Sequence, residues 1–559
     1  MRCMEVSELV RSLLAKRGVE SADDIAAFLN PDYELHTHDP FLLQGMDVAV
    51  GRVLSAMEQN ERIAVYADFD CDGIPGAAVL SDFFRKIGYE NFEVYLPHRD
   101  REGYGFHLDA ISALAGREVK LIITVDVGIT AAHAVAFAKG IGVDVIVTDH
   151  HEVTGPLPDA IAVLNPKLNG YPFPHLCGAA VAFKFVQATL AEGRKRGIPS
   201  FVGLPLGWEK WLLDLVAIAT VADMVPLVGE NRVLTHWGLQ VLRKSPRAGI
   251  SALCNAVRIR KSEITEDDIG FSIAPRVNAA SRMGEPQLAL RLLTTQDADE
   301  AEQLAAQLEK LNASRKGVVG GIVREAKKHM AARFPVEEHV VVLGNPEWKP
   351  ALLGLAANSL MNDRGGVVCL WGRDANGKLK GSCRSDGAVS VVDLFVNAGD
   401  ALEEYGGHAA SGGFSVSHES VHTLHERFAR AVAGLERSVL SGSQEPDAHM
   451  SLSEVAWPVF REVSILGPFG AGNPKPLFRI SGVTVSSLRR FGKEKNHVEV
   501  QLVCSKTGSS LRAFDFFRAP EDFSTAPSEG LSVAVLGTIE RDTYRGGLTF
   551  RLADVVSAL

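Results

Sequence analysis

Acid-rich segments follow three apolar runs of the chain, and their side chains could hold metal. Asp68-x-Asp70-x-Asp72 follows the run 63–67, Asp126 follows the run 121–125, and Asp149-His150-His151 follows the run 143–148. Converging carboxylates repel one another unless cations neutralise them, and carboxylate with imidazole suits a transition metal such as Mn²⁺ or Zn²⁺. The repetition therefore indicates a carboxylate-rich two-metal site, which is a standard device for in-line attack on a phosphodiester.

Each acidic segment also has a purely structural explanation. The first motif could be a solvated turn, Asp126 could cap the next helix, and His150-His151 could be a hydrogen-bonded loop. Asp223 lies in an apolar stretch, where burial requires a partner such as a metal or a helix end. An EF-hand is excluded, because its twelfth position would be Val79 and the preceding segment has the pattern of a strand.

The apolar pattern predicts the elements that must position these side chains. From 62 to about 150, strands alternate with helical stretches, which is typical of βαβ units and a parallel sheet. Residues 298–333 carry the apolar spacing of a long amphipathic helix. A second α/β unit runs to about 436, and the C-terminal hundred residues have the strand alternation and Gly-rich turns of a small barrel.

Composition limits the class of protein. A chain of 559 residues is too long for one core and predicts several domains. The net charge of −10 argues against a histone-like coating of nucleic acid, but not against a local basic groove. The cysteines are dispersed without a CxxC pair, which predicts reduced thiols. We found no signal-like N-terminus and no bilayer-spanning apolar run, so a cytoplasmic protein is expected.

The barrel region interleaves basic and aromatic side chains: Arg489-Arg490-Phe491, Arg512, Phe514 and Phe516-Phe517-Arg518. Single-stranded nucleic acid is bound by cations that contact its backbone and by rings that stack on its bases. Strand alternation would also place about half of these rings in the barrel core. Both explanations remain open at this point.

These segments carry a resemblance to a known family. The segments 67–73, 125–128, 148–151 and 221–227 resemble, in order, the four motifs of the DHH phosphoesterase superfamily. Gly406–Gly413 resembles the GGH motif of the DHH-associated domain. Further segments, at 96–99, 103–105, 274–280, 381–385 and 468–474, resemble the RecJ family of single-strand-specific 5′ to 3′ exonucleases. Cys71 and Pro75-Gly76 depart from the usual family pattern without removing a metal ligand.

The resemblance implies an α/β fold with a parallel-sheet DHH domain, a long connecting helix, a smaller α/β DHH-associated domain and a C-terminal OB-fold β-barrel. The predicted boundaries are an N-terminal helical segment at 1–45, the DHH catalytic domain at 46–297, the connecting helix at 298–336, the DHH-associated domain at 337–437, a linker at 438–452 and the OB-fold at 453–559.

The resemblance also implies roles for individual residues. Asp68, Asp70, Asp72, Asp126, His150 and Asp223 would ligate one or two Mn²⁺ or Mg²⁺ ions. Asp70, Asp126 and His151 would be catalytic, with His151 facing the scissile phosphate and Asp149 supporting it. The substrate would be held by Arg99, Arg276, Asn278, Arg282, Ser382, Arg384, Gly407 and His408.

The implied function is the metal-dependent degradation of single-stranded DNA, 5′ to 3′, into 5′-mononucleotides in DNA repair and recombination. Single-strand binding protein and a recombination helicase are the implied partners, and the chain is expected to be a monomer that does not bind membranes. Two alternatives remain: a phosphodiesterase for oligonucleotides or cyclic dinucleotides, and a catalytically inactive DNA-binding scaffold.

Overall fold

The computed structural model of this chain describes residues 6–168, 170–335, 338–435, 445–492, 495–542 and 545–558. They fall into two compact units. The two-sheet unit comprises His38–Val225 and Leu234–Ser441, and the barrel unit comprises Met1–Thr37, Pro226–Val233 and Gly442–Leu559. Within the described ranges, no helix combines the length and the apolar character needed to cross a membrane.

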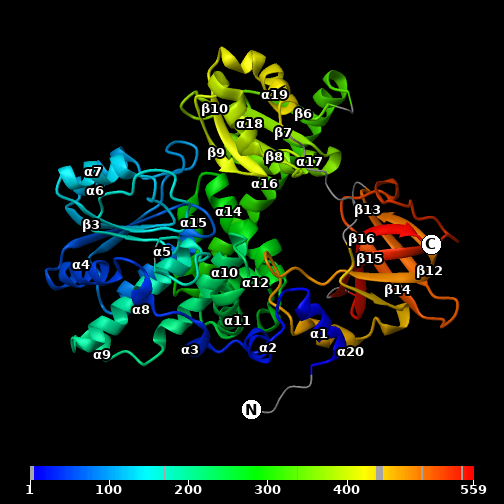
Figure 1. Cartoon of the computed structure of the whole chain (residues 1–559). Helices are drawn as coiled ribbons and strands as arrows, with labels where there is room; N and C mark the ends of the chain where they lie inside the picture. Colours follow the sequence, from blue (N-terminus) through cyan, green and yellow to red (C-terminus); the bar gives the residue numbers. More distant parts are fainter. Residues whose placement is uncertain are drawn as a thin grey trace. The chain divides into compact units, whose positions relative to one another are not determined.

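The first sheet of the two-sheet unit is entirely parallel and has the order β2-β1-β3-β4-β5. Figure 1 shows this sheet in blue and cyan around the label β3. Its strands are β1 (Arg62–Ala67), β2 (Phe92–Tyr95), β3 (Val119–Val125), β4 (Asp144–Thr148) and β5 (Ala162–Leu164). The strand order changes direction between β1 and β3, and in open α/β sheets ligands bind at the carboxyl ends of the strands beside such a point.

Helices cover this sheet, which explains why its central strands are continuously apolar. The helices that pack against it are α4 (Met46–Glu58), α5 (Gly73–Lys86), α6 (Leu108–Gly116), α7 (Ala132–Gly140) and α8 (Gly178–Lys195). A helical layer follows in the chain: α10 (Leu213–Ala222), α11 (Gly229–Lys244), α12 (Ala248–Ala256), α14 (Ala274–Arg282) and α15 (Pro286–Thr294). The long helix α16 (Ala298–Arg333) packs against α12, α14 and α15, and then against α17 (Pro350–Arg364).

The second sheet is mixed, with the order β6-β7-β8-β10-β9, and only its β6–β7 pair is parallel. Its strands are β6 (Val340–Gly344), β7 (Val367–Arg373), β8 (Leu379–Ser385), β9 (Glu404–His408) and β10 (Ser411–Val416). α18 (Val391–Ala398) and α19 (Leu424–Ala433) pack in one core with this sheet, and α17 packs in another with α16.

The barrel unit is a sheet that closes through an antiparallel pairing of β12 with β15. Its strands are β11 (Ala448–Met450), β12 (Phe478–Phe491), β13 (His497–Val503), β14 (Ser510–Asp515), β15 (Ser532–Arg541) and β16 (Leu548–Ser557). The N-terminal helices α1 (Glu8–Ala15) and α2 (Ala22–Leu29) contribute Leu13, Leu14 and Leu29 to the barrel core.

The predicted α/β fold, with its long helix and C-terminal barrel, is confirmed. The domain boundaries stay predictions, and residues 438–444 of the predicted linker lie outside the described residues. The closure of the barrel leaves fewer open strand edges than a flat sheet would have.

Candidate active site

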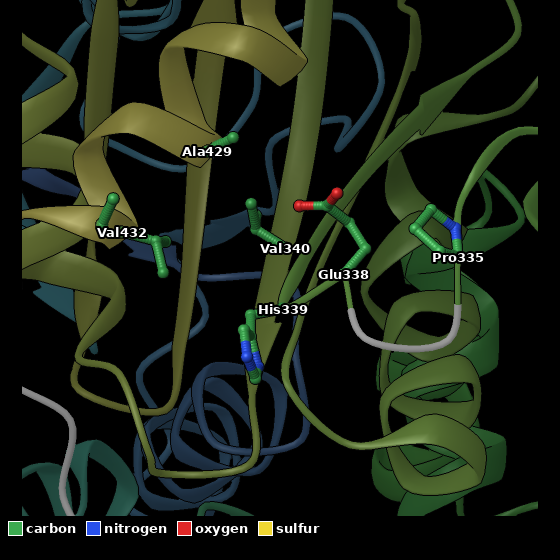
Figure 2. Close-up of a pocket in the computed structure, with 7 residues that line it drawn as sticks. Pro335, Glu338, His339, Val340, Ala429 and Val432 are labelled. Atoms are coloured by element: carbon green, nitrogen blue, oxygen red, sulfur yellow. The ribbon is translucent and has the colours of Figure 1, made fainter.

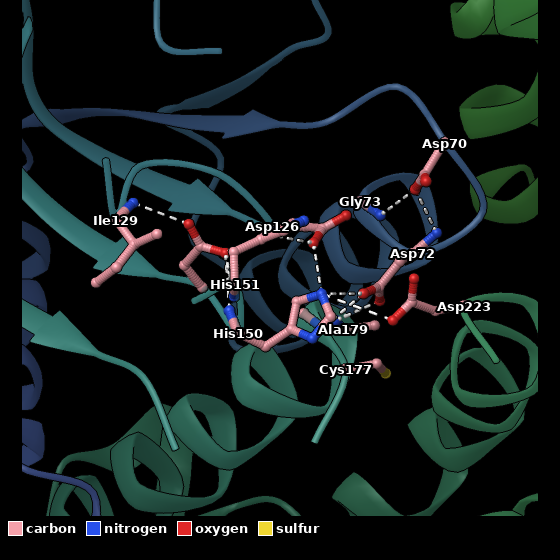
Figure 3. A network of polar contacts seen from close by, with 12 residues as sticks. Asp70, Asp72, Gly73, Asp126, Ile129, His150, His151, Cys177, Ala179 and Asp223 are labelled. Atoms are coloured by element: carbon pink, nitrogen blue, oxygen red, sulfur yellow. Dashed lines mark hydrogen bonds and ion pairs between the residues drawn. The ribbon is translucent and has the colours of Figure 1, made fainter. Parts of the chain in front are cut away.

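All six predicted metal ligands gather at the carboxyl edge of the first sheet, beside the point where the strand order reverses. Asp68 and Asp126 directly follow β1 and β3, and Asp223 follows α10. Figure 3 shows the meeting of Asp126, His150 and Asp223. The side chains form three groups, and within each group the possible ligand atoms lie within 4.8 Å of one another. The groups are Asp68, Asp70 and Asp126; Asp72, His150 and Asp223; and Asp126, His150 and His151.

His150 occupies the middle of this cluster. Its Nε2 lies 3.2 Å from Asp126 Oδ1 and 3.6 Å from both Asp72 Oδ2 and Asp223 Oδ2. Burial, and then the charge of His151, lowers the pKa of His150 to about 3. The imidazole is therefore neutral at pH 7, which is the protonation state that a metal ligand requires.

The carboxylates of the cluster are held in an environment that disfavours their charge. Burial and the charge of Asp70 raise the pKa of Asp72 to about 6, while burial and the charge of Asp72 raise that of Asp223 to about 8. The pKa values of Asp68 and Asp126 are also well above the usual range, for the same two kinds of cause.

Unpartnered oxygens show that the protein alone does not satisfy this site. Oδ1 of Asp68 and Oδ1 of Asp126 are buried and have no hydrogen-bond donor among the described residues. Buried acceptors without donors are costly, and several buried carboxylates together repel one another. Divalent cations would satisfy both needs, so these side chains fit a metal centre.

Backbone geometry brings the carboxylates this close. Asp126 has φ 60°, a left-handed conformation that is unusual for a residue with a side chain. A Cβ on Gly178 would lie 2.6 Å from Cβ of Asp126, so only glycine fits there. Asp72 accepts hydrogen bonds from N–H of Gly178 at 2.6 Å and of Ala179 at 2.7 Å, at the start of α8. The positive end of α8 therefore fixes Asp72.

The loop after β1 is fixed by side chains that accept from its backbone. Asp70 Oδ1 accepts from N–H of Asp72 at 2.8 Å and of Gly73 at 3.2 Å, where α5 begins. Asn278 Oδ1 accepts from N–H of Cys71 at 3.0 Å. Burial and the charge of Asp70 raise the pKa of the Cys71 thiol, which keeps it protonated and unreactive.

The two neighbouring histidines differ in environment. His151 Nδ1 lies 2.8 Å from Asp149 Oδ1, and Asp149 also accepts from N–H of Ile129 at 2.8 Å. Burial alone would lower the pKa of His151, but the hydrogen bond and charge of Asp149 raise it to about 9. His151 is therefore cationic at pH 7 and has an exposed side-chain fraction of 39%, against 11% for His150.

Tyr104 belongs to the site, although the sequence-based assignment did not include it as a site residue. Its hydroxyl lies 3.3 Å from His151 Nδ1 and donates to the Asp126 carbonyl oxygen, also at 3.3 Å. The residue keeps 50% of its surface exposed. The available signal was the segment Gly103-Tyr104-Gly105, in which an aromatic residue stands between two glycines, both with positive φ.

Arginines predicted to bind substrate also lie in the two-sheet unit. The Arg99 guanidinium stacks 4.8 Å from the centre of the buried Phe69 ring, next to Asp68 and Asp70. Arg282 donates to the Ala351 carbonyl oxygen at 2.9 Å. Burial, followed by the positive charge of Arg99, lowers the pKa of Arg282 to about 9. A buried cation among other cations is a natural partner for an anion.

Arg384 and Ser382 lie together on β8, against the first turns of α17. A Cβ on Gly354 would meet Arg384 Nη2 at 2.6 Å and Ser382 Oγ at 3.6 Å. Gly354 therefore leaves the space that the guanidinium fills. No local sequence pattern indicates this arrangement, because the two segments meet only in the fold.

The other predicted substrate residues are placed less directly. Arg276 is engaged by Glu309 Oε2 at 2.5 Å, and Asn278 holds the loop after β1. Gly407 and His408 lie on the exposed strand β9. The charge of His408 helps to lower the pKa of Glu152, after the larger effect of Lys167, which places His408 near the residue that follows His151.

Comparison with known proteins adds three family models. The model described as the DHH family, N-terminal domain, matches residues 62–220; the DHHA1 domain matches residues 337–434; and the RecJ OB domain matches residues 446–553. Every predicted metal ligand except Asp223 lies within the first of these matches.

Curated relatives match most of the chain. The single-stranded-DNA-specific exonuclease RecJ of Haemophilus influenzae is 31% identical over 86% of this chain and 84% of its own length. The chain belongs to the RecJ family. The RecJ of Bacillus subtilis is 34% identical over 95% of this chain, which spans only 65% of that relative's length.

A solved RecJ structure has the same fold. RecJ of Thermus thermophilus in complex with Mn²⁺ has a TM-score of 0.78 and 28% identity, over 99% of this chain and 76% of the other. Its complex with Mg²⁺ has a TM-score of 0.72, over 100% and 76%. The resemblance to RecJ is therefore confirmed over most of this chain.

The barrel of this RecJ-family chain has an aromatic cluster with paired cations around it. Phe516 and Phe517 are 40% and 74% exposed, whereas Phe514 is buried. His497 makes ring contacts with Phe516 and Phe517. Arg551 lies 4.4 Å from the Phe516 ring centre and is paired with Asp515. Phe514 is thus a core ring and Phe516 and Phe517 are surface rings, while the stacking of surface rings on nucleic-acid bases stays a prediction.

A separate pocket lies beside the second sheet (Figure 2), and it is lined by Pro335, Glu338, His339, Val340, Ala429, Val432 and Ala433. None of the predicted site residues lines it. This pocket is therefore not part of the candidate active site at the edge of the first sheet.

Proposed function

We propose that this chain is a metal-dependent exonuclease that hydrolyses single-stranded DNA from its 5′ end into 5′-mononucleotides, in DNA repair and recombination. The observation that carries the proposal is the buried acid–histidine cluster with unpartnered carboxylate oxygens at the edge of the first sheet. The names of the relatives, which are single-stranded-DNA-specific exonucleases, support the same substrate.

One or two Mn²⁺ or Mg²⁺ ions would be held by Asp68, Asp70, Asp72, Asp126, His150 and Asp223. A donor set rich in carboxylate oxygen with one imidazole suits these ions. When bound, they supply Lewis acidity toward a phosphodiester and its attacking water. Asp126 and His150 each belong to two of the three donor groups, so both would hold metal at the centre of the cluster.

His151 would contact the phosphate that is cut. Asp149 holds Nδ1, so the second ring nitrogen, Nε2, is left to donate its proton to a phosphate oxygen. The raised pKa keeps that proton in place at pH 7, where the growing negative charge on the phosphate is stabilised by a cation.

The 5′ polarity rests on the cationic side chains near the cluster. Arg99, Arg282 and Arg384, with Ser382, would hold a 5′-terminal phosphate, because guanidinium groups bind phosphate oxygens in a bidentate manner. A strand anchored by its 5′ end would then present its first linkages to the metal centre.

The test uses 3′-labelled single strands, on which removal from the 5′ end yields a ladder of shortened labelled products. We expect shortening with Mn²⁺ and none with Asp126→Asn. Asp159→Asn, a surface acid with a 77% exposed side chain, changes the charge equally and should retain activity. A wild-type protein that shortens no strand with either Mn²⁺ or Mg²⁺ would contradict the proposal.

Blocked ends and short substrates separate the alternatives. A blocked 5′ end should stop the reaction and a blocked 3′ end should not. A dinucleotide phosphodiesterase would hydrolyse a dinucleotide faster than a long strand, and an inactive scaffold would bind without cutting. We further propose a cytoplasmic monomer that works beside single-strand binding protein and a recombination helicase, as the resemblance implies.

A further inference from the structure

The inward face of α16 changes from apolar to polar in its middle. Leu304 and Leu308 are buried on the first part of this face, and Ile322 and Ala326 are buried on the last part. Between them, at helical spacing, Asn312 is only 1% exposed and Arg315 is half-buried. Burying polar side chains in an otherwise apolar face costs free energy unless they have partners.

These two side chains are not satisfied by each other. Arg315 Nη2 donates to Asn312 Oδ1 at 2.9 Å. Asn312 Nδ2 and Arg315 Nε are buried, yet neither has a hydrogen-bond acceptor in the described parts of the chain. Two donors therefore remain without an acceptor, and the missing acceptor is best supplied by a ligand.

The surroundings of Arg315 are cationic. Burial and the charge of Arg276 lower the pKa of Arg315, and Arg315 in turn contributes to the lowered pKa of Arg282. The nearest acid on α16, Glu309, is engaged by Arg276 Nε at 2.5 Å. Like charges gathered in a partly buried region repel one another until an anion lies among them.

We propose that Arg315 binds a backbone phosphate of the single strand, distinct from the terminal phosphate and from the phosphate that is cut, and that Asn312 positions its guanidinium. This second phosphate subsite rests on the proposed function. It places a contact on α16, where neither the motifs nor the comparisons assign a role. Guanidinium N–H groups match phosphate oxygens, and the unsatisfied Nε–H supplies one of the donors.

The test measures binding of a single strand without cleavage, in EDTA, over a series of salt concentrations. Arg315→Gln is compared with Lys316→Gln, which removes the same charge from the exposed neighbour. We expect Arg315→Gln to weaken binding about fivefold and to reduce the salt slope of log K by ~0.7, the value for one phosphate contact on a single strand. Lys316→Gln should change neither. Equal effects of the two variants would overturn the proposal.

A neutral methylphosphonate, moved one linkage at a time along the strand, locates the contact. At one internal linkage it should weaken binding by the wild type and leave binding by Arg315→Gln unchanged. An effect of Arg315→Gln that disappears on 5′-hydroxyl strands would instead assign Arg315 to the terminal phosphate and overturn the proposal. Asn312→Ala should act in the same direction as Arg315→Gln and add nothing to it in the double variant.

Stability separates a binding role from a structural one. Removing Arg315 relieves repulsion from Arg276, so the Tm of Arg315→Gln should equal or exceed that of the wild type. A clearly lower Tm, with unchanged salt slope, would show a structural role. The wild type is tested for binding and shortening of the strand in the same series. If the wild type fails, the proposed function is rejected. If the wild type succeeds and Arg315→Gln binds with unchanged affinity and salt slope, only the subsite is rejected.

Discussion

The edge of the first sheet and the surface of the barrel treat charge in opposite ways. At the sheet edge, Asp68 and Asp126 are buried with unpartnered oxygens and raised pKa values. On the barrel, Glu499 is paired with Arg489 at 2.7 Å and Arg512 at 3.0 Å. Burial would raise the pKa of Glu499, but these arginines lower it to about 2. The carboxylates at the sheet edge would be neutralised by bound cations, whereas Glu499 is neutralised by arginines of the protein itself.

The difference indicates that the charges at the sheet edge serve function, whereas the charge pairs on the barrel serve stability. Functional sites retain unfavourable electrostatics that a ligand relieves, and paired surface charges contribute modestly to folding. Variants of the sheet edge should therefore lose activity without losing stability. Variants of the barrel pairs should lose stability first.

The largest expected effect is that of Asp126→Asn on turnover. Asparagine tolerates the left-handed backbone at this position, so the fold should be kept. We expect kcat to fall by about a thousandfold, on the scale of lost electrostatic stabilisation of a transition state. Because one of several repelling carboxylates is removed, the metal-free Tm should stay equal or rise. A fall in both kcat and Tm would show that Asp126 has a structural role.

Asp149→Asn should have a smaller effect, with a change in pH dependence. We expect activity to fall by about 10- to 100-fold, the range for removing a partner that orients a metal-ligating histidine. Without the charge of Asp149, the pKa of His151 should fall from about 9 toward its ordinary value. The variant should then lose activity as pH rises above ~6.5, where free histidine loses its proton. The measurement is kcat from pH 6 to 9.5, and an unchanged profile contradicts the role given to His151.

Metal and pH should act together on the stability of the two-sheet unit. In the folded protein the pKa values of Asp72 and Asp223 are raised to about 6 and about 8, above their ordinary value. Their contribution to the free energy of unfolding is therefore fully present below the pKa of the unfolded state. This contribution is lost as pH rises through the folded-state pKa values of about 6 and about 8. The metal-free Tm should fall from pH 5 to pH 8 in thermal scans.

Mn²⁺ at about 100 times its Kd should restore about 2.7 kcal/mol. The matched control is Asp126→Asn, in which the restored stability should be smaller. A metal-free Tm that is flat from pH 5 to pH 8, or an equal response of both proteins to Mn²⁺, would contradict the metal centre.

The smallest expected effect is that of Glu499→Gln on the barrel. Because the folded pKa is depressed to about 2, Glu499 stabilises the fold above its ordinary pKa, and this contribution is lost as pH falls toward 2. We expect about 1 kcal/mol of destabilisation at pH 7, typical of lost charged hydrogen bonds at a surface. Urea titrations at pH 7 and below pH 4 should show the difference shrinking. A pH-independent difference would point to packing instead.

Much of the sheet edge could be predicted from local patterns. Each acidic motif directly follows an apolar strand, and parallel strands end at one edge, so Asp68, Asp126 and His150 had to come together. The strand alternation of the C-terminal hundred residues also predicted a small barrel, which the structure forms from β12 to β16. These features depend on periodicity and on chain order alone.

Contacts between distant segments could not be predicted in this way. Nothing near Gly178 or Gly354 in the sequence shows that a Cβ there would collide with Asp126 or Arg384. The pairing of Glu499 with Arg512 depends on the register of β13 and β14. Tyr104 required knowledge of a loop that brings it to His151. Such contacts arise from the packing of the whole fold.

The fixing of Asp72 by the start of α8 has a consequence for the order of events during synthesis. The carboxylate of Asp72 can be held in place as a metal ligand only after Gly178 and Ala179, which donate to it, have been synthesised. Asp223 is synthesised later still. A growing chain would carry the aspartates of the first motif long before it could hold an ion among them. Divalent metal should therefore bind after the first sheet has folded. It would stabilise the folded sheet and would not initiate its folding.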